Sequence, residues 1–489
     1  MGTEIDTEMY TGTGTEVDAE TDTETESGME TEKRPESEIR TLAEFIHQLT
    51  WEQLPDQVRE AAVFRVLDLV STAAGAADDP LVKHMADACR RFAGEGNIHV
   101  WGRKETYSLS AAAMLNGMLA HTLELDDVHP ASKTHGSASL IPAAWACAEY
   151  LGSSGKDFLT AVVCGYETVS RIGMALGVSS HRSRGWHATA TCGVFGCAAA
   201  CAKLLKLNTE QIISALGMAG TQSSGVWAFL GDGSNCKILH PGRAAANGLE
   251  AVFLAQAGMT GPEHILDAKD GGLLYAMSDG GDGTKVSEGL GETWEILKMD
   301  MKPYPCCRST HSVIDCALKL RKGLNVHEIA SIHIGTYLVG YKQCAVSEGC
   351  LHPKSVLDAK FSAPYAAAAA LLYGKVTMAE FEPEVIGREE LQTLVGKIKA
   401  EPEERFTSQY PKHWSAAMTI TMKDKTVYQT EVTDPSGSMA VPLTRTQVME
   451  KAEELLHNAY PGREQEIIEE VLKLADAPHL PVFEHLQNP

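Results

Sequence analysis

Hydrophobic residues along the first two-thirds of the chain recur at the spacing of packed helices. Asp56 can cap a segment whose apolar residues, from Val58 to Val70, follow a helical period. Asn208 and Gln211 have the spacing of a capping box. Four further segments are rich in small residues on several sides, as in helices buried among other helices: LSAAAMLNGMLAH, SLIPAAWACAEYLG, GVFGCAAACAKLL and GRAAANGLEAVFLAQAG. The pattern predicts helix after helix, without a repeat of fixed period.

The pattern changes near residue 300, where apolar and polar residues begin to alternate. The segments IASIHIGTYLV and AAMTITMKDKTVYQTEV have a period of two, which is typical of strands, and Asp424 and Lys425 mark a turn within the second. The alanine-rich segment DAKFSAPYAAAAALLYG between them predicts a helix. Residues 300–437 are therefore predicted to form a smaller α+β unit.

Helical patterning returns after the Pro-Ser-Gly break at residues 435–437. Thr444 and Gln447 can open one helix, and a second is expected from about Arg463. We expect this last part, residues 438–489, to pack back onto the first helical part, residues 39–299. The predicted fold class is mainly α, with a large all-helical domain and a smaller α+β domain inserted into it.

The N-terminal stretch differs in composition from the rest of the chain. Residues 1–38 are rich in Thr, Glu, Asp and Gly and carry few apolar side chains, so they cannot bury enough surface to offset the entropy of ordering. We expect a disordered, solvated acidic tail, with an interaction tail as the alternative. The formal net charge of the chain is -23, which argues against nucleic acid or an anionic membrane as a partner.

The sequence indicates neither a membrane span nor a secretory signal. It contains no run of about eighteen uninterrupted apolar residues, and its N-terminus lacks a basic stretch followed by an apolar one. We therefore expect a cytoplasmic protein. Its 12 cysteines include no CxxC pair, which favours free thiols in a reducing compartment over a disulfide framework.

A dense group of acids and histidines lies in AHTLELDDVHPASKTHGSASL. A helix running into this segment would present its polar residues at the helix end and the following loop, on a rigid support. The alternative is ordinary capping and surface charge. The ligand spacing fits no zinc or calcium template, so we expect no metal. The residues of the group are His121, Glu124, Asp126, Asp127, His129 and His135.

Two further segments place cationic or imidazole groups ahead of buried helices. In RSRGWHATATCG, His187 precedes a helix start that can hold an anion, although a histidine satisfied within the core is the alternative. In GDGSNCKILHPGRAAANG, Lys237, His240 and Arg243 precede another helix. The second segment lacks the spacing and preceding strand of a phosphate loop, so nucleotide binding is rejected. A lysine and an arginine at this place suit a polycarboxylate substrate.

The segment KMDMKPYPCCRSTHSVID lies at the border between the helical part and the strand-containing part. Domain borders are places where pockets form. We therefore expect a substrate pocket there, lined from a set of polar residues that comprises Lys302, Tyr304, Cys306, Cys307, Arg308 and His311.

Five blocks of the sequence together resemble the MmgE/PrpD family: ELDDVHPASKTHGSASLIPA, GWHATATCGVFGCAAA, CKILHPGRAAANG, KPYPCCRSTHSVID and DAKFSAPYAAA. This family includes 2-methylcitrate dehydratase, cis-aconitate decarboxylase and iminodisuccinate epimerase. The resemblance covers roughly residues 40–485 in consistent order. It implies an all-helical domain built from N- and C-terminal segments, an inserted α+β lid, a homodimer, and no metal or organic cofactor.

The resemblance also implies site residues. The decarboxylase pattern is matched at Glu124, where animal decarboxylases have Asp, and at His135, His187, Lys237 and Tyr341, while Cys307 stands where they have histidine. The reactions of the family labilise a bond next to a carboxylate, which requires cations for the anions and groups that move a proton. The predicted catalytic residues are Glu124, Asp127, His135, His187 and Tyr341, and the predicted substrate-binding residues are Lys237, Lys302, Cys307, Arg308 and His311.

Several assignments of role are open at this stage. His135, oriented by Glu124 or Asp127, can be the base, with His187 or Tyr341 as the acid, and the roles are interchangeable. The predicted function is a cofactor-independent lyase that dehydrates or decarboxylates a small di- or tricarboxylic acid. An epimerase of a polycarboxylate such as iminodisuccinate is the first alternative, and a non-catalytic helical scaffold or binding protein is the second.

Overall fold

The structure, a computed structural model, describes residues 37–483. The predicted acidic tail, residues 1–38, lies outside the described residues except at its end. There Ser37 accepts a hydrogen bond from the backbone N–H of Arg40 and caps helix α1 (Glu38–Gln48), so the last two residues assigned to the tail belong to the folded helical part. Within residues 37–483, none of the helices has both the length and the apolar character that a membrane span requires.

The first two-thirds of the chain is helical, as predicted. The four segments rich in small residues form α4, α5, α8 and α10, and the capping box of Asn208 and Gln211 is present at α9. Asp56 is the first residue of its helix and not the cap, which is Pro55. The helices are α2 (Asp56–Gly75), α3 (Pro80–Ala93), α4 (Leu109–Thr122), α5 (Ser137–Leu151), α6 (Gly155–Ala175), α7 (Val178–Ser183), α8 (Ala188–Leu204), α9 (Thr209–Thr221), α10 (Leu239–Gln256) and α11 (Leu273–Ala276).

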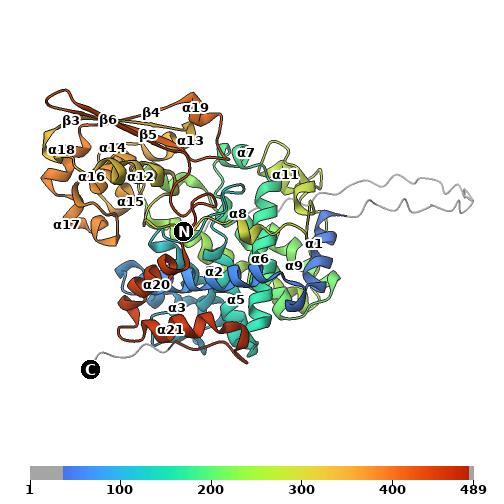
Figure 1. The fold of residues 1–489 in the computed structure, drawn as a ribbon. Coiled ribbons are helices and arrows are strands. Elements are labelled where there is room, and N and C mark those ends of the chain that lie inside the picture. The colour runs from blue at the N-terminus through green and yellow to red at the C-terminus, as the bar shows by residue number, and fades with distance from the viewer. Residues whose placement is uncertain (1–36, 484–489) are drawn as a thin grey trace, which may run out of the picture. The chain divides into compact units, whose positions relative to one another are not determined.

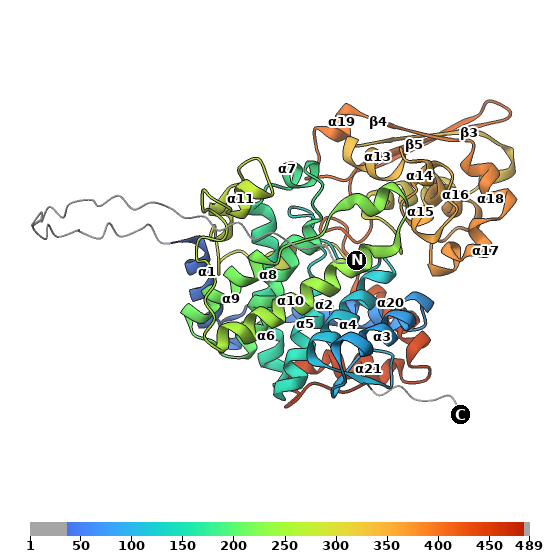
Figure 2. The same cartoon turned by 180° about the vertical axis from the view of Figure 1, so that it is seen from behind.

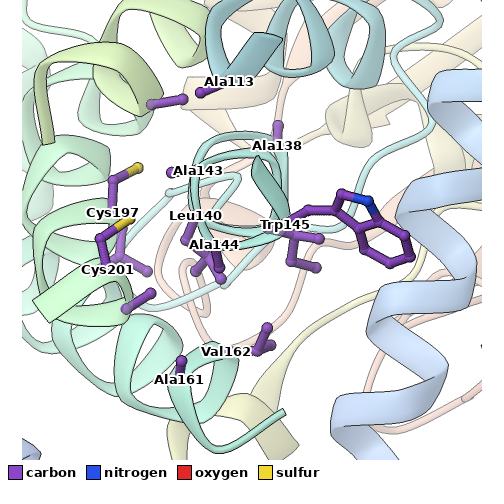
Figure 3. Packing of buried hydrophobic residues seen from close by; sticks show 14 of the residues in the cluster. Ala113, Ala138, Leu140, Ala143, Ala144, Trp145, Ala161, Val162, Cys197 and Cys201 are labelled. Carbon is purple, nitrogen blue, oxygen red and sulfur yellow. The ribbon is translucent and has the colours of Figure 1, made fainter. Parts of the chain in front are cut away.

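Small residues let these helices approach closely. Figure 3 shows alanine, leucine and cysteine side chains of α4, α5, α6 and α8 packed together with Trp145. A Cβ atom on Gly117 of α4 would lie 2.9 Å from the Cα of Gly242 in α10, so only glycine fits there without a shift. This close approach lies one turn before the C-terminal end of α4 and one turn after the start of α10. It therefore brings the segments that flank these helices together.

The strand-containing part holds a four-stranded sheet with the order β4-β3-β5-β6. The predicted hairpin is confirmed, with its turn at Asp424 and Lys425. Strand β4 was not predicted; it pairs parallel to β3, with Ile398 opposite Ile332. The strands are β3 (Ile329–Thr336), β4 (Ile398–Pro402), β5 (Ala416–Met422) and β6 (Val427–Val432), and a separate short hairpin is made of β1 (Ile98–His99) and β2 (Thr106–Tyr107).

The helix predicted over the alanine-rich segment is two helices. Ser362 accepts a hydrogen bond from the N–H of Tyr365 and starts a new helix, with Pro364 in its first turn. The helix is therefore interrupted after Lys360. The helices near the sheet, visible in Figure 1, are α12 (His311–Leu320), α13 (Leu338–Cys344), α14 (Glu348–Leu351), α15 (Val356–Lys360), α16 (Ala363–Tyr373), α17 (Pro383–Ile386), α18 (Glu389–Val395) and α19 (Glu404–Thr407).

The C-terminal helices return to the first part of the chain. The capping box of Thr444 and Gln447 opens α20 (Arg445–Ala459), and α21 (Glu464–Leu472) follows, as predicted. Both pack against α2, and Figures 1 and 2 show them beside it from the two sides. The buried apolar residues form two large clusters: one joins residues 39–299 with residues 452–483, and the other lies within residues 306–432. The mainly α fold class is confirmed.

Candidate active site

A cavity of about 320 Å³ lies where the two hydrophobic clusters adjoin. One wall comes from the loop after α4, the start of α8 and the residues before α10. The other comes from the segment that precedes α12 and from residues around α13, α15 and α19. Most of the predicted site residues contribute to its wall, namely Glu124, His135, His187, Lys237, Lys302, Cys307 and Arg308.

The loop after α4 is held by three lysines from distant parts of the chain. The carbonyl oxygens of residues 123–125 each accept a hydrogen bond of 3.0 Å, from Lys360, Lys302 and Lys451 in that order. Two of these carbonyls adjoin the C-terminal end of α4, where the helix dipole favours cations. Glu124 has a φ of 58°, in the left-handed region that non-glycine residues seldom adopt. These contacts fix the backbone that presents the Glu124 carboxylate.

The carboxylate of Glu124 is paired with two buried lysines. Lys237 Nζ donates a hydrogen bond to Glu124 Oε1, and Lys302 Nζ lies 3.5 Å from Glu124 Oε2. Burial alone would raise the pKa of Glu124, but the charges of Lys237 and Lys302 hold that pKa below its ordinary value. Glu124 is therefore an anion at neutral pH, and it fixes the position of both ammonium groups.

Asp126 joins two histidines beside this pair. Asp126 Oδ2 accepts a hydrogen bond of 2.7 Å from His121 Nδ1 and lies 3.1 Å from His135 Nδ1. Lys237 Nζ donates to His121 Nε2 at 2.8 Å, so the His121 ring is neutral, with its proton on Nδ1. Burial, together with the charge of Lys237, lowers the pKa of His121 to about 4 despite the carboxylate of Asp126. His135, by contrast, reaches the cavity wall, with 14% of its side chain exposed.

His187 occupies the N-cap position of α8, as its place in the sequence predicted. Its Nδ1 lies 2.8 Å from Nδ1 of His240, so one ring donates and the other accepts. Its ring stands edge-on to Trp227, with the centroids 4.8 Å apart. Burial and the charge of Lys237 lower the pKa of His187 well below its ordinary value. His187 is therefore a neutral imidazole at neutral pH.

The segment before α12 supplies Cys307 and Arg308 to the wall. The guanidinium of Arg308 donates to Asp300 at 2.9 and 3.1 Å, and to His311 Nδ1 and the carbonyl of Ser436 at 2.9 and 2.8 Å. Its donors are thus engaged within the protein. A hydrogen bond from Cys344 lowers the pKa of Cys307 to about 7.

Three predicted site residues do not contribute to the cavity wall. Asp127 accepts hydrogen bonds from the hydroxyl groups of Ser137 and Tyr166, at 2.6 and 2.7 Å, and is buried between α5 and α6. His311 is buried behind Arg308, to which it is hydrogen-bonded. Tyr341 lies on α13, where the neighbouring Lys342 and Gln343 reach the wall instead.

Residues 40–284 match the model of the MmgE/PrpD N-terminal domain, and residues 304–476 match that of the MmgE/PrpD C-terminal domain. The chain belongs to the MmgE/PrpD family. It is 29% identical over 469 residues to the cis-aconitate decarboxylase-like protein oryM of Aspergillus oryzae, covering 91% of this chain and 96% of the relative. It is 28% identical over 431 residues to cis-aconitate decarboxylase of Mus musculus, covering 84% and 85%. A 2-methylcitrate dehydratase of Cupriavidus necator is 24% identical over 311 residues, covering 58% and 61%.

The family assignment makes this chain an enzyme of the lyase class. Its candidate site also contains one group with the shape of a metal site, since ligand atoms of His121, Asp126 and His135 lie within 4.8 Å of one another. Two ammonium groups compete for that place: Lys237 lies 2.8 Å from His121 Nε2, and Lys302 lies 3.6 Å from Asp126 Oδ1. Two neighbouring positive charges make the group a poor fit for a divalent cation.

Sequence reasoning left several residues at the cavity unassigned. His121 and Asp126 belong to the acid and histidine group; they are buried and do not line the cavity, and the sequence assigned Asp127 to the site and not Asp126. Lys133 lies inside the same block, between small polar residues, and gave no separate signal. Arg182 and Phe361 stand in quoted segments without being singled out there, and further wall residues come from segments that no pattern marked, among them Trp227, Lys342, Gln343, Tyr410 and Trp414.

Proposed function

We propose that this enzyme is a cofactor-independent lyase that acts on a small di- or tricarboxylic acid, by dehydration or decarboxylation next to a carboxylate. The observation that carries the proposal is the buried group of Glu124, Asp126, Lys237 and Lys302 beside the cavity. It provides two fixed ammonium groups where negative charge must be stabilised. The names of the relatives favour the same two reactions and this substrate class.

His135 is the proposed base. It reaches the cavity, and Asp126 lies 3.1 Å from its Nδ1, where a carboxylate stabilises the imidazolium that forms when the other ring nitrogen takes a proton. His121 and His187 are less suited to this role, because burial lowers the pKa of each ring.

The two lysines provide the proposed charge stabilisation. In dehydration, His135 removes the proton from the carbon next to a carboxylate, the electron pair forms the C=C bond, and the hydroxyl group leaves as water with the proton that His135 has gained. In decarboxylation, the C–C bond to the leaving carboxylate breaks, CO₂ leaves, and the electron pair remains on an enolate-like intermediate until the protonated His135 donates its proton to carbon. Both reactions build negative charge on an oxygen, which Lys237 and Lys302 stabilise in a site shielded from water.

We further propose that residues 300–437 act as a lid over residues 39–299 and 438–489. The cavity is lined from both sides of this border, which supports a site completed by closure. The chain enters the proposed lid near Asp300 and leaves it near Ser436. Arg308 forms an ion pair with Asp300 and donates a hydrogen bond to the carbonyl of Ser436, so it links these two ends of the lid. A homodimer and a cytoplasmic location complete the proposal.

The test is a screen of the purified enzyme against citrate, 2-methylcitrate, cis-aconitate and iminodisuccinate. Ultraviolet absorbance follows a conjugated alkene, and NMR in deuterated water follows proton exchange and the product. We expect elimination or loss of CO₂ from a tricarboxylate by the wild type and by the surface variant His327→Asn, and neither reaction in His135→Asn. Proton exchange with inversion and no loss of a group would assign an epimerase instead. The absence of any reaction would favour a binding protein.

A further inference from the structure

Lys133 is a buried cation that the proposed reaction does not use. Its ammonium nitrogen is buried, and within residues 37–483 it has neither a hydrogen-bond partner nor a salt bridge. It lies over two aromatic rings of the other wall, 3.7 Å from the ring centroid of Trp414 and 4.2 Å from that of Tyr410. The residue lines the cavity, and its φ is 59°, in the left-handed region.

The other buried lysines, and the arginine of the segment before α12, differ from Lys133 because each has a polar partner. Lys237 and Lys302 are paired with carboxylates, Arg308 is paired with Asp300, and Lys360 donates to the backbone carbonyls of Thr122 and Leu123. Lys133 has only the faces of aromatic rings, which offset a small part of the free energy that a buried ammonium loses with its hydration. Arg182 is similar, since its Nε is buried without a partner among the described residues and its guanidinium lies 4.3 Å from the ring centroid of Trp227.

Neither of these two cations forms a salt bridge with an acid of the described chain, and Asp300, whose carboxylate acts on Lys133, is already paired with Arg308. A carboxylate entering the cavity would accept hydrogen bonds from Lys133 and supply the missing counter-charge, in surroundings where such bonds are stronger than in water. The aromatic rings of Trp414 and Tyr410 would exclude water around that contact.

We propose that Lys133, together with Arg182 of the same cavity lining, forms an anion subsite that binds a carboxylate of the substrate remote from the reacting carbon. This inference rests on the proposed function and restricts the substrate that it allows. The substrate carries at least two carboxylates, of which one contacts the Lys237 and Lys302 region and another contacts Lys133. Lys133 is thus a specificity-determining residue that selects polycarboxylates over acids lacking the second anion.

The experiment compares two ligands that differ in one carboxylate: propane-1,2,3-tricarboxylate and 2-ethylbutanedioate, in which a methyl group replaces a terminal carboxylate. Their dissociation constants are measured by calorimetry at fixed ionic strength. We expect the wild type to bind the triacid at least about tenfold more tightly, the factor that corresponds to one charge-assisted contact. In Lys133→Met this preference falls to about one, while the affinity for the diacid changes less than about twofold.

Lys206 provides the matched control. It too is a lysine with a left-handed backbone, at φ 53°, but its side chain is exposed and it does not line this cavity. Lys206→Met should keep the wild-type preference. Lys133→Arg should restore most of the preference that Lys133→Met loses. If Lys133→Met fails to fold, Arg182→Met takes its place, with a partial loss of preference expected.

Three results would overturn the subsite: an unchanged preference in folded Lys133→Met, an equal loss of affinity for both ligands, or binding of neither ligand by the wild type at millimolar concentration. Turnover of cis-aconitate and 2-methylcitrate is measured on the same preparations. Turnover without a wild-type preference for the triacid contradicts the subsite and leaves the proposed function standing. A preference that depends on Lys133 without turnover supports the subsite and contradicts the proposed function.

Discussion

The cations around the cavity fall into two groups. Lys237, before α10, and Lys302, in the segment before α12, are paired with Glu124 and Asp126 of the loop after α4. Next to the aromatic wall of Tyr410 and Trp414, the ammonium of Lys133 has no acid partner in the described chain. The comparison indicates that paired and unpaired cations have different roles. Paired cations hold fixed geometry for the reaction, whereas an unpaired cation keeps its charge free for a ligand.

The largest expected effect is the loss of stability on removal of a paired lysine. Lys237→Met removes the partner of a buried carboxylate, and we expect the free energy of unfolding to fall by about 3–5 kcal/mol. Urea denaturation measures this change. Lys473→Met, at an exposed pair with Glu469, is the control and should change stability by less than about 0.5 kcal/mol. A loss from Lys237→Met as small as that of the control would contradict the structural role given to the pair.

A second prediction separates the histidines. His135→Asn should lower kcat by about a hundredfold or more, because it removes the proposed base, while the fold is retained. His187→Asn should have a smaller effect, because His187 is a neutral ring paired with His240. Steady-state kinetics on the substrate found in the screen measure both values. A larger loss from His187→Asn than from His135→Asn would exchange their roles.

The third prediction concerns the stability cost of the unpaired cation. Lys133→Met should raise the free energy of unfolding by about 1–2 kcal/mol, because a buried ammonium without a partner is replaced by an apolar chain of similar length. Thermal and urea unfolding measure the gain. A gain in stability together with the loss of preference for the triacid would mark Lys133 as a residue kept for ligand binding. A loss of stability would mean that the aromatic rings alone compensate for its burial.

The pH dependence of this gain has a definite sign. Burial and the charge of Arg308 lower the pKa of Lys133 well below its ordinary value, although the carboxylate of Asp300 opposes the shift. Between that lowered pKa and the unfolded value near 10.4, the unfolded state binds more protons, so the stability of the wild type rises with pH relative to Lys133→Met. Burial raises the pKa of the facing Tyr410, which keeps its hydroxyl from titrating in this window. The advantage of Lys133→Met should thus be largest at low pH and shrink as pH rises; a constant advantage would contradict the lowered pKa of Lys133.

The smallest effect is expected from removing the N-terminal acidic stretch. Deleting residues 1–36 should leave the melting temperature and turnover nearly unchanged, because this acidic stretch has few apolar side chains to bury. Calorimetry and kinetics on the shortened chain test this. A large drop in either value would mean that the stretch contributes to the folded part of the enzyme.

Local patterns in the sequence predicted most of the fold correctly. The capping boxes that begin at Asn208 and Thr444, the buried helices and the β5–β6 hairpin depend on neighbouring residues, so the sequence carries them directly. Strand β4 was missed because its pairing with β3 is a long-range contact and the strand is short, with only Ile398 fully buried. The break after Lys360 was missed because helical periodicity continues across the Ser362 cap.

In the candidate site, too, the sequence does not predict which side chains come into contact. Two adjacent acids follow Leu125, and the pattern does not tell which one faces the histidines. Asp126 binds His121, whereas Asp127 binds Tyr166 and Ser137, because consecutive residues of an extended loop point to different sides.

The sequence alone predicted the helical segments, the family, and the residue types that carry the chemistry, because each rests on local spacing or on blocks of matching residues. The tertiary structure decided which charges are paired. Lys133 and Trp414 are far apart in the chain, as are Lys237 and Glu124, and only packing brings each pair together. The free energy of a buried charge depends on what surrounds it in space, so the difference between a fixed cation and a free one arises only in the folded protein.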